Sequence, residues 1–83
     1  MNFTEEEKML DRLRKIICEF VDMKPEDIKP ETNIHKDLGL NSLELVNLAV
    51  EIEEEFDVEI PDREAMELET VADAIRIIEE YMK

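Results

Sequence analysis

The segment LGLNSLELV, residues 38–46, places one serine where a glycine-containing stretch gives way to an apolar-rich run. The hydroxyl of Ser42 could be a nucleophile, a helix cap or a point of covalent attachment. A serine nucleophile needs a base in reach and a third group that orients the base. The only histidine, His35, lies in a loop beside Lys and Asp, and a lone loop histidine is most often a solvated surface residue. The chain also has no G-x-S-x-G elbow and no glycine-rich phosphate loop. We therefore expect no catalytic residue here and no enzyme.

The two remaining roles of Ser42 depend on where the helix begins. Asn41 and Ser42 are both favourable N-cap residues, and Asn41 with Glu44 has the spacing of a capping box. A serine at a helix start is most often a cap or a first-turn residue. If Asn41 is the cap, however, Ser42 becomes the first helical residue, with an exposed hydroxyl. A phosphate ester there would lie near free backbone N–H groups and the positive end of the helix dipole.

The helix that would follow carries two apolar faces. At about 100° per residue, one stripe suits a core and comprises Leu45, Leu48, Ala49, Ile52 and Phe56. A second stripe is bordered by Glu53, Glu54 and Asn47 and comprises Leu43, Val46 and Val50. Packing of this second stripe against another helix is an alternative, but it would drive Glu53 into the bundle, and carboxylates are almost never buried without a partner. We therefore expect a partly exposed "docking strip" of Leu43, Val46 and Val50, suited to transient contact with a basic partner surface.

The elements on either side of this helix are also helical. Thr4 and Glu7 have capping-box spacing, and a buried face recurs after them at Met9, Leu13, Ile16 and Phe20. Residues 22–40 lack helical periodicity, which predicts a long ordered loop anchored in the core by Ile28, Ile34, Leu38 and Leu40. In this loop, Gly39 permits a tight bend or a close approach.

Two further helices complete the expected fold. Pro61 indicates a short helical piece over about 62–67. Thr70 and Asp73 begin a last helix whose core face comprises Val71, Ile75, Ile78 and Met82, and Met66 is expected in the core as well. The pattern predicts an all-α four-helix bundle, with three longer helices, one short helix and a long loop between the first two.

Size, charge and cysteine content limit the function classes. The 83 residues predict a single domain, 1–83, with a small core. Twenty-four acids against ten bases give a net charge of −14, which disfavours nucleic acid and anionic lipid and favours basic protein partners. Cys18 is alone, so we expect a partly buried filler, no internal disulfide and no metal site. With no long apolar run, we expect a cytoplasmic monomer that does not insert into membranes.

Residues 37–75, DLGLNSLELVNLAVEIEEEFDVEIPDREAMELETVADAI, resemble the acyl carrier protein family, whose signature is D-S-L within LG-x-D-S-L before an acidic helix. The resemblance implies a stand-alone carrier with 4′-phosphopantetheine on Ser42, between Asn41 and Leu43. A separate phosphopantetheinyl transferase, holding its own Mg²⁺, would move this arm from coenzyme A. The thiol of the arm would carry acyl intermediates as thioesters in fatty acid or polyketide-type biosynthesis.

The resemblance also implies roles for the residues around Ser42. Partner enzymes with basic patches would meet Glu44, Glu53 and Glu54 together with the docking strip, and Asn47 stands where an acid is common in the family. The acyl chain would enter a small cavity lined by Ile52, Phe56, Ile60 and Ala65. The family's aspartate before the serine is Asn41 here, which keeps the capping ability but lacks the negative charge that helps engage the transferase.

Other function classes stay open beside the acyl carrier. One is a carrier of aminoacyl or peptidyl groups. Another is an unmodified acidic helical adaptor that kept the fold and lost the arm, and Asn41 is the main support for it. A calcium sensor is disfavoured, because the chain has no D-x-[DN]-x-[DN]-G loop and its one glycine is Gly39.

Overall fold

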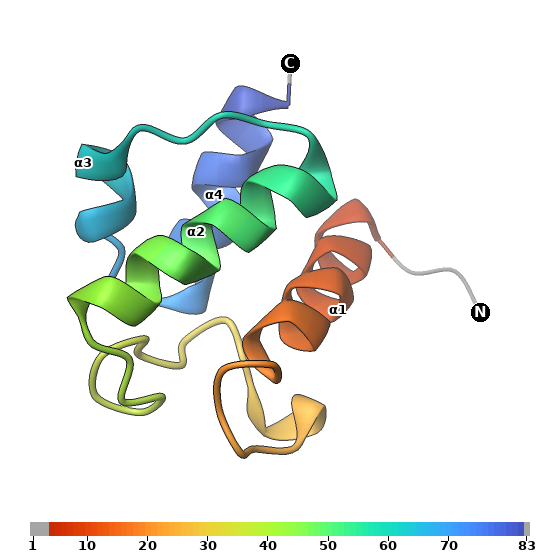
Figure 1. The fold of residues 1–83 in the computed structure, drawn as a ribbon. Coiled ribbons are helices and arrows are strands. Elements are labelled where there is room, and N and C mark those ends of the chain that lie inside the picture. Colours follow the sequence, from red (N-terminus) through yellow and green to blue (C-terminus); the bar gives the residue numbers. More distant parts are fainter. Residues whose placement is uncertain (1–3, 83) are drawn as a thin grey trace.

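The computed structural model describes residues 4–82 and shows the predicted helical bundle (Figure 1). Its elements are α1 (Glu5–Ile17), a 3₁₀ turn η1 (Pro25–Asp27), α2 (Ser42–Phe56), α3 (Asp62–Met66) and α4 (Val71–Tyr81). Helix α2 packs against both α1 and α3, and α1 also contacts α4 and η1. Within the described residues, the only pairing of strand type is an isolated bridge between Asn33 and Thr70. No helix in that range is long and apolar enough to cross a bilayer.

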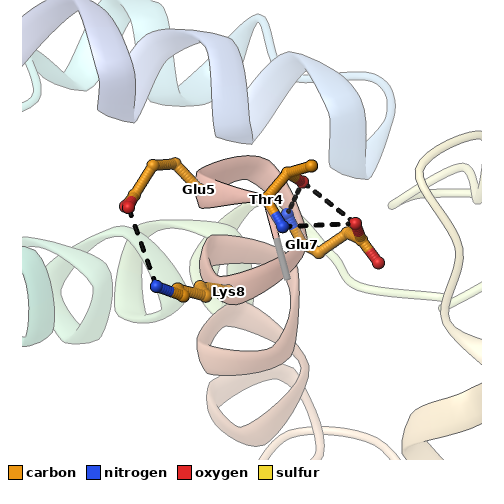
Figure 2. Close-up of polar contacts among 4 residues, drawn as sticks. All are labelled: Thr4, Glu5, Glu7 and Lys8. Atoms are coloured by element: carbon orange, nitrogen blue, oxygen red, sulfur yellow. Dashed lines mark hydrogen bonds and ion pairs between the residues drawn. The ribbon is translucent and has the colours of Figure 1, made fainter. Parts of the chain in front are cut away.

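All three longer helices begin with a capping box, as the sequence predicted. Figure 2 shows the box of α1, where the Glu7 backbone N–H donates to Thr4 Oγ1 at 3.1 Å. In return, the Thr4 N–H donates to Glu7 Oε1 at 3.3 Å, so two amides that lack helical partners are satisfied. The adjacent pair of Lys8 Nζ and Glu5 Oε1, at 3.8 Å, is exposed and adds little stability.

The long segment between α1 and α2 is ordered by its apolar anchors and by hydrogen bonds to the start of α4. Its anchors are all buried, as predicted, and they are Ile28, Ile34, Leu38 and Leu40. The amide of Ile34 donates to the Glu69 carbonyl at 2.8 Å, and the amide of Val71 donates to the Thr32 carbonyl at 3.0 Å. The loop that precedes α2 is therefore fixed to the segment between α3 and α4, although the two lie far apart in the sequence.

Two expected core residues prove to be exposed. Met66 is 46% exposed and Met82 is 49% exposed. In the short α3 the buried side chain is Ala65, and the next residue lies about 100° further round the helix, away from the core. Met82 is the C-cap residue, one position beyond the end of α4, so the helical pattern that placed it on the core face no longer applies. Phe20 also lies beyond its helix and is half-buried.

Tyr81, at the end of α4, is tied to α3 by a hydrogen bond from its hydroxyl to the Glu64 carboxylate. This hydrogen bond is the main cause that raises the pKa of Tyr81, and desolvation and the negative charges of Glu64 and Glu80 add to it. Because Tyr81 is the only tyrosine and the chain has no tryptophan, the absorbance of ionised tyrosine reports on this group alone. We expect Glu64→Gln to lower the pKa of Tyr81 in an alkaline absorbance titration, since the charged acceptor is lost. Glu79→Gln is the matched control. If the pKa of Tyr81 falls equally in both variants, the hydrogen bond to Glu64 is not the main cause of the raised value.

Candidate functional site: the start of α2

Asn41, not Ser42, caps α2. The Asn41 side chain accepts a hydrogen bond from the Glu44 N–H at 2.8 Å, and the Glu44 carboxylate accepts one from the Asn41 N–H at 3.0 Å. Ser42 is therefore the first residue of the helix, and it is exposed. None of the hydrogen bonds found among residues 4–82 uses its hydroxyl. The side chain is free for an external reaction, which settles the question that the sequence left open about the cap.

The backbone that leads into Ser42 is held by a compact polar turn. The Asn33 side-chain oxygen accepts hydrogen bonds from the amides of His35 and Lys36, at 2.9 and 2.8 Å. Asp37 Oδ2 in turn accepts one from the Asn33 amide at 2.8 Å. The turn ends at Gly39, whose φ of +71° is in the left-handed region that other residues rarely adopt. A Cβ at Gly39 would meet no atom within 4 Å, so the bend, and not a close approach, requires the glycine.

His35 is exposed, as expected, but its ring also contacts two backbone carbonyls. Its Nδ1 lies 3.3 Å from the Leu40 carbonyl oxygen, and its Nε2 lies 3.2 Å from the Leu68 carbonyl oxygen. With both ring nitrogens occupied by carbonyl groups, the ring offers Ser42 no free base. Sequence reasoning missed these contacts because Leu68 is distant in the chain and a backbone carbonyl carries no sequence signal.

The docking strip has the exposure that its spacing predicted. Leu43 is 71% exposed and Val50 is 46% exposed, while Val46 is half-buried. The three side chains lie on one face of the helix that begins at Ser42, and a contiguous exposed apolar patch is typical of an interaction site. The expected polar neighbours Asn47 and Glu54 are exposed as well.

The other two acids expected to meet partners also have structural roles. Glu44 completes the cap of α2, as its spacing indicated. Glu53 is half-buried, and its Oε2 accepts a hydrogen bond from the Ile60 amide at 2.7 Å. Glu53 thus fixes the segment that joins α2 to α3, a role that sequence reasoning missed.

Beneath α2, the four residues expected to line a cavity are all buried in the core. Their exposed fractions are small, at 1% for Ile52, 6% for Phe56, 6% for Ile60 and 1% for Ala65. They come from α2, from α3 and from the segment between these helices. The guanidinium of Arg12 lies 4.3 Å from the centre of the Phe56 ring, and its Nη2 donates to the Glu55 carbonyl at 2.7 Å. Arg12 of α1 therefore covers this end of α2 and stabilises it by contacts that the sequence did not reveal.

The start of α2 suits a phosphate ester. The first intrahelical hydrogen bond runs from the Leu45 N–H to the Asn41 carbonyl, at 2.9 Å, so the amides of Ser42 and Leu43 precede it. Unpaired amides at a helix N-terminus, together with the helix dipole, favour a negative group. Ser42 is exposed, so a group attached to its hydroxyl would displace no core residue.

Comparisons with known proteins agree with this geometry. Residues 11–78 match the family model described as "Phosphopantetheine attachment site". The fold is similar to the solved structure of the acyl carrier protein from Enterococcus faecalis, with a TM-score of 0.78 and 31% sequence identity. That match covers 94% of this chain and 99% of the other. The chain therefore belongs to the acyl carrier protein family, and it contains the domain to which 4′-phosphopantetheine is covalently attached.

Proposed function

We propose that Ser42 carries the 4′-phosphopantetheine arm and that the protein carries acyl intermediates in fatty acid or polyketide-type biosynthesis. The strongest support is that Asn41, and not Ser42, caps α2, so that Ser42 is left exposed. When bound, the arm supplies a terminal thiol on which acyl groups are held as thioesters. Carrier proteins of this family are generally not catalytic, which agrees with a serine that has no base beside it.

The attachment step needs a separate enzyme because this chain provides only the acceptor. A bond forms between Ser42 Oγ and the phosphorus that bears the pantetheine group in coenzyme A. The bond from that phosphorus to the rest of coenzyme A breaks, and adenosine 3′,5′-bisphosphate leaves. The hydroxyl proton must pass to a base of the transferase, since His35 has both ring nitrogens against carbonyl groups. In this proposal the Mg²⁺ also belongs to the transferase.

Docking of partners is proposed to use the exposed side of α2. The docking strip gives an apolar contact, and Glu44, Asn47, Glu53 and Glu54 surround it with polar and acidic groups. A partner with an apolar depression ringed by Arg or Lys would complement this surface, and its association would be faster at low salt. Since Glu44 and Glu53 also hold the backbone, Glu54 is the acid on this face best suited to a purely electrostatic role.

The cargo is proposed to be sheltered between α2 and α3. Ile52, Phe56, Ile60 and Ala65 are packed at 6% exposure or less, so an acyl chain can reach them only if these side chains move apart. The smallest of them, Ala65, lies on the five-residue α3, which has the least helical hydrogen bonding of its own. We propose that an outward movement of α3, which packs against α2, opens this part of the core.

Incubation of the unmodified protein with coenzyme A, Mg²⁺ and a phosphopantetheinyl transferase tests the proposal. We expect the intact mass to rise by one phosphopantetheine group, and no rise without coenzyme A. Protein that stays unmodified with several transferases of different specificity would contradict a carrier role. Loading of the modified protein by acyl ligases, compared with aminoacyl ligases, then separates an acyl carrier from an aminoacyl carrier.

Asn41 gives a prediction about the rate of attachment. Asn41→Asp keeps a side-chain oxygen for the Glu44 amide, so stability should change by no more than about 0.5 kcal/mol. The new carboxylate adds negative charge beside Ser42, where a basic transferase must dock. We expect kcat/KM for phosphopantetheine transfer to rise about threefold to tenfold, an effect that shrinks as salt is added. Arg76→Gln on α4 also makes the net charge one unit more negative, but away from the docking surface, and it is the control; equal gains in both variants would show that net charge alone decides the rate.

Asn41 also favours a second candidate, an adaptor that kept the docking surface and lost the arm. In that case, protein from the native host would be uniformly unmodified and would still bind a basic partner. The same host protein would carry the arm if the first proposal is correct, so a single mass measurement distinguishes them.

A further inference from the structure

The side chain of His35 joins two segments that lie on either side of the attachment loop. The Leu40 carbonyl, which Nδ1 approaches at 3.3 Å, belongs to the residue two positions before Ser42. The Leu68 carbonyl, which Nε2 approaches at 3.2 Å, lies in the linker between α3 and α4. One ring therefore spans from the start of α2 to the end of the α3 region.

The protonation state of the ring decides whether both hydrogen bonds can form at the same time. A backbone carbonyl oxygen only accepts, so each ring nitrogen must present an N–H to it. The neutral imidazole has one N–H and one lone pair, and it can donate only one of the two hydrogen bonds. The imidazolium has two N–H groups and can donate both.

Charged groups near the ring do not compete for these N–H groups. Within residues 4–82 no ion pair involves His35. On its own turn, Lys36 is exposed and the Asp37 carboxylate accepts from the Asn33 amide. On the linker, Glu67 and Glu69 flank Leu68 and are exposed, while on α2 the Glu44 carboxylate is held by the Asn41 amide. The partners of the ring are thus the two carbonyl oxygens.

We propose that His35 is a positioning residue whose imidazolium clamps the attachment loop to the α3–α4 linker. With the clamp closed, the Leu40 peptide, and with it Asn41 and Ser42, is held in a fixed place relative to α3. The neutral ring has a single N–H, so loss of the ring proton leaves only one of the two hydrogen bonds and loosens the start of α2. The clamp is inferred from the two contacts of the ring alone, whereas its importance for Ser42 depends on the proposed function.

The neighbouring backbone would hold the segments together when the clamp opens. The Ile34 amide donates to the Glu69 carbonyl at 2.8 Å, and the Leu40 amide donates to the Ile34 carbonyl at 3.3 Å. Loss of the ring contacts should therefore change local opening near Ser42 without unfolding the bundle. This gives the clamp a measurable signature that differs from a loss of global stability.

Amide hydrogen exchange of the unmodified protein, followed by NMR at about pH 5.5 and 8, tests the clamp directly. Protection factors, corrected for the intrinsic pH dependence of exchange, are read at Asn41, Glu44 and Leu68. Relative to His35→Phe, which keeps a ring without N–H groups, we expect wild-type protection to be about twofold to fivefold higher at the lower pH. At the higher pH, the wild-type protection should fall to the level of His35→Phe either at Asn41 and Glu44 or at Leu68. Lys36→Gln, the control on the same turn, should keep the wild-type pH dependence.

If the ratio of the wild-type protection factors to those of His35→Phe is the same at both pH values, the proposal is overturned. If the variant does not fold, the wild-type protein alone decides, because its ring ¹⁵N shifts and its amide protection must change over the same pH interval. A ring that titrates while protection at Asn41, Glu44 and Leu68 stays constant also overturns it.

Phosphopantetheine transfer tests the positioning role. The ratio of kcat/KM for wild type over His35→Phe, taken at each pH, cancels the pH dependence of the transferase itself. We expect this ratio to be about twofold to fivefold at the lower pH and smaller at the higher pH, and a constant ratio contradicts the positioning role. If neither protein is modified, the attachment proposal fails, while the exchange measurement still decides the clamp.

Discussion

Ser42→Ala should abolish phosphopantetheine transfer while leaving the fold unchanged. The Ser42 hydroxyl takes part in no hydrogen bond found among the described residues, and Asn41 caps the helix, so removal of the hydroxyl costs α2 no cap. Alanine is the best helix former at such an exposed position, so the free energy of unfolding should change by less than about 0.5 kcal/mol. Intact mass after incubation with coenzyme A and a transferase should show no added group, even after many times the wild-type reaction time.

The control for this substitution is Thr70→Ala, which removes a hydroxyl that does cap a helix. The Thr70 Oγ1 accepts from the Asp73 amide at 3.2 Å, so its loss should cost about 1 kcal/mol and leave transfer intact. The two substitutions should therefore separate attachment from capping. Transfer to Ser42→Ala at any appreciable rate would move the attachment point to another residue.

Leu43→Gln should give the second largest effect, a loss of partner recognition. Leu43 is the most exposed large apolar residue described and directly follows the proposed attachment point. Glutamine has a similar size and suits a helix, but its amide would have to lose water on docking without a gain in apolar contact. We expect kcat/KM for the transferase to fall about 10- to 30-fold, which corresponds to about 1.4 to 2 kcal/mol of binding energy.

The matched control is Met82→Gln, because Met82 is also exposed and apolar but follows the end of α4. Its effect on transfer should be less than about twofold if recognition is confined to α2. Equal losses in the two variants would mean that general surface hydrophobicity, and not the docking strip, governs the reaction.

The parts of the fold that sequence predicted are those governed by local periodicity and capping. The capping boxes at Thr4, Asn41 and Thr70 each depend on residues three positions apart, and all three are confirmed. The anchors of the long loop were identified because isolated apolar residues in a polar segment need burial. The exposed docking strip followed from a single helical wheel, although what binds to it stays a prediction.

The features that sequence missed depend on contacts between distant residues. The Arg12 guanidinium meets Glu55 and Phe56 across the α1–α2 interface, and His35 meets the Leu68 carbonyl. No spacing rule connects such residues, because the fold brings them together only after the helices pack. The errors at Met66 and Met82 have a different cause. Met66 is the last residue of α3 and Met82 directly follows the end of α4, and at a helix end a short shift changes which face is buried.

Fragment mass spectrometry of the protein purified from its own host tests the central claim most directly. We predict that a peptide containing residues 41–45 carries one phosphopantetheine group, that fragment ions assign the group to Ser42, and that any acyl cargo is released by cleavage of a thioester. An unmodified Ser42 in every molecule of that sample, or the group on a different residue, would contradict the claim.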